Sequence, residues 1–368
     1  MRVLILSGYS HPSHHRKIEL LADTPDAEIL QLLQPGNGKA SGEYPSADGQ
    51  RCYRVKVVPV CSLGQPNDPH RTVHWPMQFE LQAFHPDVIH CEHEQEGLLA
   101  AEVALARNLW LPRTPLILYS WQNILRPRRK LVRWVSDFTL RAAQHLICAS
   151  TEGVEVVRQQ GFGGGATVMP LFGLDTRYFY PRPTPHRWPR FAVGYVGRLV
   201  EEKGVETILR AAAQLPVEVV IVGSGPDRAR LVSLAQQLDL GERCHFVGEV
   251  AYDQIATYLN AFDLLVLPSR TTQHWKEQYG RVLVEAMACK VAVAGSDSGA
   301  IPEVIGSTGR IFPEGQIEAL VEVIRELSAR PDALADLRER GYQQALSRFS
   351  VEQLAAQTLS IWRSLVKD

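Results

Sequence analysis

The sequence has no excess of charge of either sign. Its 39 lysine and arginine side chains balance 40 aspartate and glutamate side chains, for a formal net charge of −1. Nucleic-acid binding proteins usually carry a clustered basic surface and a positive balance. We therefore expect no nucleic-acid partner.

Long apolar runs are also missing. The longest one near the N-terminus covers only residues 3–6, which is too short for a signal peptide. No stretch approaches the roughly 20 apolar residues that a membrane-spanning helix needs. These absences predict a cytoplasmic protein.

The chain offers no disulfide framework and no recognised metal-binding motif. Its six cysteines include no CxxC pair, and Cys91 and Cys148 fall in apolar, strand-like runs, which favours buried free thiols in a reducing compartment. Two histidine-rich segments, HPSHH and HCEHE, match no ligand signature such as H-E-x-x-H. We expect no metal ion and no other cofactor.

The second half of the chain alternates apolar runs with glycine-rich turns and helical patterns. Residues 191–196 form one such run, followed by Gly197, Arg198 and Lys203 and then by a helical pattern. Further runs precede the turn GSGP and occur in CHFVG, DLLVLPS and VAVAGS. Repeated strand-to-helix units predict a parallel, doubly wound sheet, which binds ligands beyond the carboxyl ends of its strands. Arg198 and Lys203 would lie at that edge, where two cations can neutralise a diphosphate.

Two carboxylates stand eight positions apart in the segment EQYGRVLVEAMA. Glu277 precedes Gly280, which is suited to end a loop, and Glu285 falls in the first turns of the helix that the following apolar spacing predicts. The free backbone N–H groups at Gly280 and Arg281 could bind phosphate oxygens. The carboxylates could accept hydrogen bonds from sugar hydroxyls.

The ordered segments YVGRLVEEKG, VIVGSGP, FVG, DLLVLPS, EQYGRVLVEAMA and SDSGAIPEVI resemble the nucleotide-sugar half of retaining GT-B glycosyltransferases of family 4. The resemblance implies that Arg198 and Lys203 hold the donor diphosphate, Glu285 the ribose and Glu277 the transferred sugar. The residues that it implies as catalytic are Glu277, Arg198 and Lys203. The implied donor site comprises Gly8, Gly197, Arg198, Lys203, Gly223, Gly225, Val247, Glu277, Tyr279, Gly280, Arg281 and Glu285.

The resemblance implies an α/β protein with two doubly wound, Rossmann-like domains that face a deep interdomain cleft. We place an acceptor-binding domain at residues 1–183 and the nucleotide-sugar domain at residues 184–350, with a proline-rich linker at 181–189. A helix over residues 351–368 is expected to cross back onto the first domain. In that first domain, Ser13 is the predicted N-cap of an early helix. Residues 34–51, rich in glycine and proline, are expected to form a mobile loop.

One position departs from the family. Many members carry a histidine after the strand that matches residues 116–119, whereas this chain reads YSWQN. Either an amide replaces the histidine, or a histidine elsewhere compensates, or activity is lost; we favour the amide because the donor-binding features are present. The acceptor and cleft candidates are His11, His14, His90, Glu92, His93, Gln122 and Asn123.

We therefore predict a metal-independent, retaining glycosyltransferase that moves a sugar from a UDP- or GDP-sugar to a hydroxyl of a glycan, lipid-linked or small-molecule acceptor, in glycan, polysaccharide or glycolipid biosynthesis. The alternatives are a GT-B sugar-nucleotide epimerase or phosphorylase, and a non-catalytic subunit that binds nucleotide sugars. A pyridoxal-phosphate lysine motif, which a phosphorylase would need, is not found.

Residues 126–133 (RPRRKLVR) carry five cations at the start of a predicted amphipathic helix. Two interpretations remain open for this segment. It could rest on the inner face of an anionic membrane, or its apolar face could be core while its cations are solvated.

Overall fold

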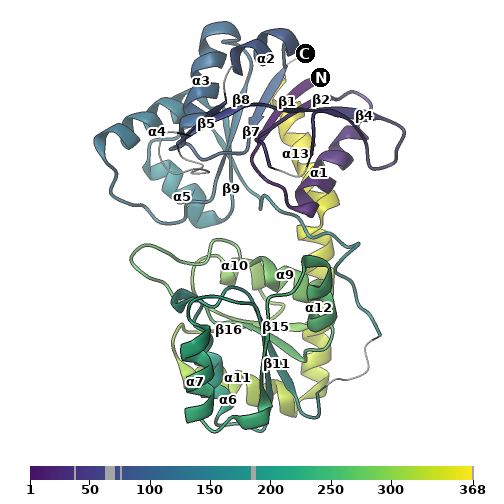
Figure 1. Ribbon diagram of the computed structural model, residues 1–368, viewed down its shortest axis with the longest axis vertical. Coiled ribbons are helices and arrows are strands. Elements are labelled where there is room, and N and C mark those ends of the chain that lie inside the picture. The colour runs from purple at the N-terminus through teal and green to yellow at the C-terminus, as the bar shows by residue number, and fades with distance from the viewer. Residues whose placement is uncertain (37–38, 63–70, 75–76, 184–187, 367–368) are drawn as a thin grey trace. The chain divides into compact units, whose positions relative to one another are not determined.

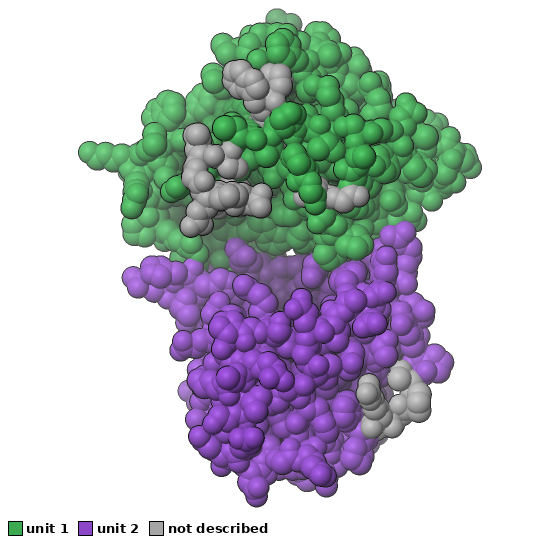
Figure 2. Space-filling model, viewed as in Figure 1, with its two compact units in different colours: residues 1–173, 351–368 green, residues 174–350 purple. Residues whose placement is uncertain are grey.

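The computed structural model describes residues 1–36, 39–62, 71–74, 77–183 and 188–366. The chain divides into two compact units, coloured green and purple in Figure 2. Unit 1 comprises residues 1–173 and 351–368, and unit 2 comprises residues 174–350. Each unit is an α/β structure built on its own sheet.

The strands of unit 1 are β1 (Arg2–Ser7), β2 (Glu28–Leu33), β3 (Gly42–Pro45), β4 (Cys52–Val57), β7 (Val88–Cys91), β8 (Leu116–Ser120), β9 (His145–Cys148) and β10 (Gly165–Val168). They form an eight-stranded sheet in the order β10-β9-β8-β7-β1-β2-β4-β3, in which only β3 runs antiparallel to its neighbour. A separate antiparallel pair joins β5 (Val60–Ser62) to β6 (Thr72–His74).

Helices cover both faces of this sheet (Figure 1) because its strands are apolar on both sides. Leu4 and Leu6 face the core beneath α2 (Met77–Phe84), α3 (Leu98–Trp110), α4 (Lys130–Ala142) and α5 (Thr151–Gln159). Val3 and Ile5 face the opposite core, beneath α1 (Pro12–Ala22) and α13 (Val351–Leu365). The last described helix therefore completes the unit that the first strand begins.

Unit 2 contains the strands β11 (Ala192–Val196), β12 (Glu218–Val222), β13 (Cys244–Gly248), β14 (Leu264–Leu267), β15 (Ala292–Ser296) and β16 (Arg310–Phe312). They form a wholly parallel sheet in the order β13-β12-β11-β14-β15-β16. Its helices are α6 (Val205–Ala212), α7 (Arg228–Gln237), α8 (Ile255–Leu259), α9 (Arg281–Ala288), α10 (Ile301–Ile305), α11 (Ile317–Ala329) and α12 (Pro331–Phe349). Helix α6 packs against α7 and α11, while α12 packs against α9 and β15.

The first boundary between the units lies after residue 173 rather than after residue 183. The N–H of Leu174 donates to the carbonyl of Phe349 at 2.8 Å, and the N–H of Arg182 donates to Asn260 Oδ1 at 2.7 Å. These bonds tie residues 174–183 to unit 2. The proposed linker at 181–189 lies partly outside the described residues, because 184–187 are not described.

Two local predictions for unit 1 were wrong. The N-cap of α1 is His11, whose side chain accepts a hydrogen bond from the N–H of Ser13. The turn-rich segment between residues 34 and 51 was expected to be a loop, yet it contains the edge strand β3. The six cysteines are free, and Cys91 and Cys148 are buried as expected.

Candidate active site

The centre of the unit 2 sheet is a topological switch point. Strands β11 and β14 are neighbours, and the chain continues from them toward opposite edges of the sheet. Open α/β sheets bind ligands beyond the carboxyl ends of such a strand pair. Gly197 and Arg198 follow β11, and Ser269 follows β14 soon afterwards.

The loops after β11 and β12 lie backbone against backbone. The N–H of Leu199 donates to the carbonyl of Ser224 at 2.8 Å. A Cβ atom on Gly223 would lie 2.0 Å from the carbonyl oxygen of Gly197, and one on Gly225 would lie 2.2 Å from that of Leu199. Glycine is thus required at both positions of the GSGP turn for this close approach.

Lys203 and Glu277 form an ion pair at this edge of the sheet. Lys203 Nζ donates to Glu277 Oε2 at 2.6 Å, and the same oxygen accepts from Ser269 Oγ at 2.8 Å. The Trp275 ring lies beside the ammonium group, with Nζ 4.7 Å from the ring centroid. The structure thus brings together two of the three predicted catalytic residues, and it adds Ser269 and Trp275, which sequence reasoning missed.

Glu285 lies in the second turn of α9, whose N-cap is Gly280 and whose N-terminus has no side-chain cap. Its carboxylate is buried, and Arg281 Nε lies 3.1 Å from Oε1 without the alignment of a hydrogen bond. Burial raises the pKa of Glu285, and the nearby Arg281 only partly offsets this. The buried hydroxyl of Tyr279 likewise lacks a hydrogen-bond partner among the described residues. Both groups retain capacity for new hydrogen bonds.

The remaining predicted donor residues of unit 2 lie on the same sheet. Arg198 is exposed, and its carbonyl accepts a 2.8 Å hydrogen bond from the Tyr195 hydroxyl. Val247 lies on β13 and is half-buried. No described contact joins Arg198 to the pair of Lys203 and Glu277, so its predicted role in holding a diphosphate stays a prediction.

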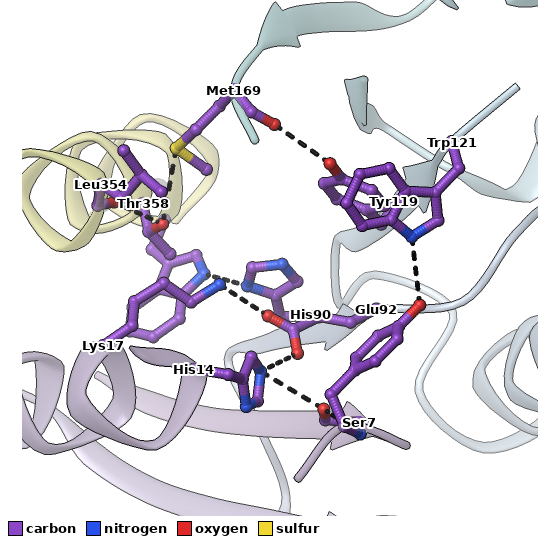
Figure 3. A network of polar contacts seen from close by, with 12 residues as sticks. Ser7, His14, Lys17, His90, Glu92, Tyr119, Trp121, Met169, Leu354 and Thr358 are labelled. Carbon is purple, nitrogen blue, oxygen red and sulfur yellow. Dashed lines mark hydrogen bonds and ion pairs between the residues drawn. The ribbon is translucent and has the colours of Figure 1, made fainter. Parts of the chain in front are cut away.

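Unit 1 has its own switch point, between β1 and β7. Beyond these strand ends lies the buried polar network of Figure 3. Lys17 Nζ donates to Glu92 Oε1 at 2.8 Å, His14 Nε2 hydrogen-bonds to Glu92 Oε2, and Ser7 Oγ lies 3.3 Å from the same histidine nitrogen. His14, Lys17 and Glu92 are almost completely shielded from solvent. The two predicted cleft candidates among them therefore lie inside unit 1.

The network keeps its carboxylate ionised. Burial alone would raise the pKa of Glu92, but the adjacent His14 and Lys17 outweigh burial and hold that pKa well below its usual range. Lys17 was not predicted, because a lysine in an amphipathic helix normally extends into solvent.

His90 is a buried neutral histidine that anchors the last helix. Trp362 Nε1 on α13 donates to His90 Nδ1 at 3.1 Å, which leaves the ring proton on Nε2. Burial lowers the pKa of His90 to about 3. The imidazole is therefore uncharged at neutral pH, and this cleft candidate lies inside unit 1.

This burial predicts loss of stability in acid. The unfolded chain takes up a proton on His90 near its ordinary pKa of 6.5, whereas the folded chain does so only near 3. Between these two pH values the unfolded state binds more protons than the folded state. The free energy of unfolding should therefore decrease by about 1.4 kcal/mol for each unit by which the pH is lowered. Urea titrations at several pH values should show a smaller slope for His90→Gln than for the wild type. Equal slopes would contradict the assignment.

His11 and His93 lie near the loop that follows β1. His11 caps α1, and its ring lies 5.1 Å from that of Phe172. A Cβ atom on Gly8 would lie 3.3 Å from His93 Cε1, so Gly8 closely approaches this histidine. The same loop contains Tyr9, whose hydroxyl accepts a 3.2 Å hydrogen bond from Trp121 Nε1.

Gln122 is the centre of a polar network after β8. Its Oε1 accepts hydrogen bonds of 3.1–3.2 Å from the side chains of Gln95, Gln160 and Arg128, and its Nε2 donates to Glu94 Oε2 at 3.2 Å. Glu94 also accepts from the N–H of Trp121 at 3.0 Å. The amide orientation is thus fixed by its partners. Neighbouring Asn123 is buried.

This geometry makes a charge change at Gln122 costly. Gln122→Glu would place a second carboxylate about 3.2 Å from that of Glu94. We expect a loss of about 1–3 kcal/mol, which corresponds to several degrees of melting temperature, and a lower turnover. Adding Glu94→Gln again places one amide donor opposite one carboxylate at these two positions. The double variant should therefore regain most of the lost melting temperature. A double variant no more stable than Gln122→Glu would contradict this pairing.

Among the residues that the structure describes, no group of three or more histidine, cysteine or acidic side chains is arranged to hold a metal ion. In the same residues, no helix has the length and apolar character needed to cross a membrane.

Two doubly wound α/β units, each with a central switch point, agree with the GT-B architecture that the sequence resemblance implies. Residues 19–172 match the family model of the glycosyl transferase 4-like domain, and residues 180–344 match that of glycosyl transferases group 1. The chain belongs to the GT-B glycosyltransferases of the family 4 type, which confirms the family and the fold indicated by the sequence.

The chain is similar to N-acetyl-alpha-D-glucosaminyl L-malate synthase of Bacillus anthracis, with 29% identity over 53% of each protein. The match thus spans about half the length of that relative. Two solved structures share the fold: sucrose-phosphate synthase from Thermosynechococcus elongatus (20% identity, 99% of each chain, TM-score 0.75) and Anabaena HepE in complex with UDP (22% identity, 99% of this chain and 100% of the other, TM-score 0.74).

Proposed function

We propose that this protein transfers a sugar from a nucleoside-diphosphate sugar to an acceptor hydroxyl with retention of anomeric configuration. The observation that carries the proposal is the cluster of Lys203, Glu277 and Ser269 at the switch point of unit 2. The similarity to an N-acetyl-alpha-D-glucosaminyl L-malate synthase, and to HepE, whose structure contains UDP, supports the same chemistry. The free cysteines suit a cytoplasmic setting.

In the proposed reaction, the acceptor oxygen bonds to the anomeric carbon on the face from which the diphosphate departs. The bond between that carbon and the diphosphate oxygen breaks, and the leaving phosphate oxygen takes the proton of the acceptor. Lys203 and Arg198 stabilise the negative charge that develops on the diphosphate. Glu277, once Lys203 faces the diphosphate, accepts hydrogen bonds from the transferred sugar. Glu285 Oε1 and the Tyr279 hydroxyl, which have no hydrogen-bond partner among the described residues, can hydrogen-bond to hydroxyl groups of the nucleotide.

No protein nucleophile and no metal ion takes part in this scheme, because protein cations supply the charge that a metal would otherwise provide. The helix N-terminus at Gly280 and Arg281 adds backbone donors. The unit 1 loops after β1 and β8 would hold the acceptor.

The test begins with a thermal-shift screen of UDP-, GDP- and ADP-sugars, since a ligand at 100 times its Kd stabilises the folded state by about 2.7 kcal/mol. The donor that binds is then incubated with candidate acceptors, and the product is examined by NMR with and without EDTA. We expect a product with the donor's anomeric configuration in both cases. An inverted product would refute the mechanism, and an epimer formed without acceptor would indicate an epimerase.

A further inference from the structure

The start of α4 and the segment before it carry apolar and basic side chains that extend into solvent. Leu125, Leu131 and Trp134 are 51%, 72% and 65% exposed. Arg126, Arg129, Lys130 and Arg133 are exposed on the same stretch. We call these seven side chains the basic-apolar surface.

The apolar side of α4 is only partly core: Val135 is buried and Phe138 packs against the core, whereas Leu131 and Trp134 are exposed. Had the apolar side of α4 been only core, Leu131 and Trp134 would have been covered by unit 1. The core of unit 1 instead takes Leu140 of this helix, while Trp134 stacks on Phe138 with ring centroids 5.9 Å apart. Large apolar side chains held in water beside cations indicate an interaction surface.

Arg128 does not belong to this surface. Its side chain is only 10% exposed, forms an ion pair with Glu96 and donates to Ser136 Oγ at 2.9 Å and to Gln122 Oε1 at 3.2 Å. The sequence placed Arg128 among the surface cations. The structure instead turns it inward, toward the network around Gln122.

Two cations of this surface are not neutralised by an ion pair within the described structure. Arg129 and Lys130 form no ion pair with any residue described by the structure, and Arg133 approaches Asp137 only at 4.0 Å.

We propose that the basic-apolar surface docks on an anionic lipid bilayer. Leucine and tryptophan tips would enter the boundary between headgroups and acyl chains, while the flanking cations would meet the anionic headgroups. A nucleic acid would pair with the cations but leave Leu131 and Trp134 exposed to water. A bilayer would contact both the cations and the apolar side chains, so it fits the surface better. If the proposed function holds, docking would favour a lipid-linked acceptor.

Vesicle co-sedimentation tests this proposal without any sugar substrate, so its outcome is independent of the proposed reaction. The protein should sediment with vesicles of phosphatidylcholine and phosphatidylserine at low salt, and be released at high salt as the charges are screened. Each cation should strengthen binding about fivefold, so the variant Arg129→Gln/Lys130→Gln/Arg133→Gln should bind about 100-fold more weakly. Leu131→Ser/Trp134→Ser should also weaken binding. Both variants should melt like the wild type, because the changed side chains are exposed.

Arg128→Gln is the matched control, since it removes a neighbouring cation that faces inward. It should keep vesicle affinity, while its effect should appear in turnover. Three results would overturn the proposal: wild-type protein that stays in the supernatant with anionic vesicles at low salt, equal binding to vesicles of phosphatidylcholine alone, or unchanged binding of the triple variant.

Discussion

Lys203→Ala should lower turnover by about 10²–10³-fold and weaken nucleoside-diphosphate binding. Lys203 Nζ lies 2.6 Å from Glu277 Oε2 at the switch point of unit 2, so its loss removes positive charge where the leaving group is expected. Steady-state kinetics and calorimetry with the nucleoside diphosphate measure the two effects. Arg198→Ala should act in the same direction, because its exposed side chain follows the same strand, β11, as Lys203.

A suitable control is Lys290→Ala, which removes an exposed lysine paired with Glu339 at 2.7 Å. Its kinetics should match those of the wild type. Glu277→Gln should chiefly slow transfer, whereas Glu285→Gln should chiefly weaken nucleotide affinity. Unchanged diphosphate affinity in both Lys203→Ala and Arg198→Ala would refute the assignment of the two cations.

Glu92→Gln should destabilise the protein by about 3–5 kcal/mol, because it leaves the buried ammonium group of Lys17 without its counter-charge. Urea unfolding followed by circular dichroism would measure the loss. The lowered pKa of Glu92 gives the pH dependence: its stabilisation is complete above the ordinary pKa of 4.5 and is lost as the pH falls toward the folded value.

Glu28→Gln provides a matched surface control. Glu28 also contacts two cations, Arg2 at 3.2 Å and Arg54 at 2.7 Å, but it is exposed, so its loss should cost no more than about 1 kcal/mol. Adding Lys17→Met to Glu92→Gln removes the unpaired charge and should recover part of the stability. If Glu92→Gln cost no more than Glu28→Gln, the buried network would not be a major contributor.

The strands of the fold were predictable because buried parallel strands read as continuous apolar runs. The run at residues 116–119 became β8, and the run at 191–196 became β11. The edge strand β3 has no such signal, since it is mostly exposed and forms by pairing with β4. The N-cap of α1 was misplaced, although Pro12 at the first helical position signals the earlier start.

The candidate site was predictable for residues that directly follow a strand, because the end of the strand places them at a known edge of the sheet. Lys203 and Glu277 could be assigned to one edge of the sheet, but their direct ion pair depends on side-chain directions that spacing does not give. The burial of polar residues could not be read from the sequence. His14 and Glu92 looked like loop residues, yet both are buried, His14 on α1 and Glu92 just after β7. Lys17 and His14 hydrogen-bond to the Glu92 carboxylate there, which compensates its burial.

Unit 1 is assembled from both ends of the described chain, with all of unit 2 between them. During translation, α1 therefore emerges long before α13, which brings Leu354 and Trp362 to the same core. At about 5–20 residues per second, synthesis of residues 174–350 takes roughly 10–35 s. During that interval, α13 cannot yet cover its face of the unit 1 sheet, and His90 lacks its hydrogen bond from Trp362. A ribosome-associated chaperone would have its clearest target there.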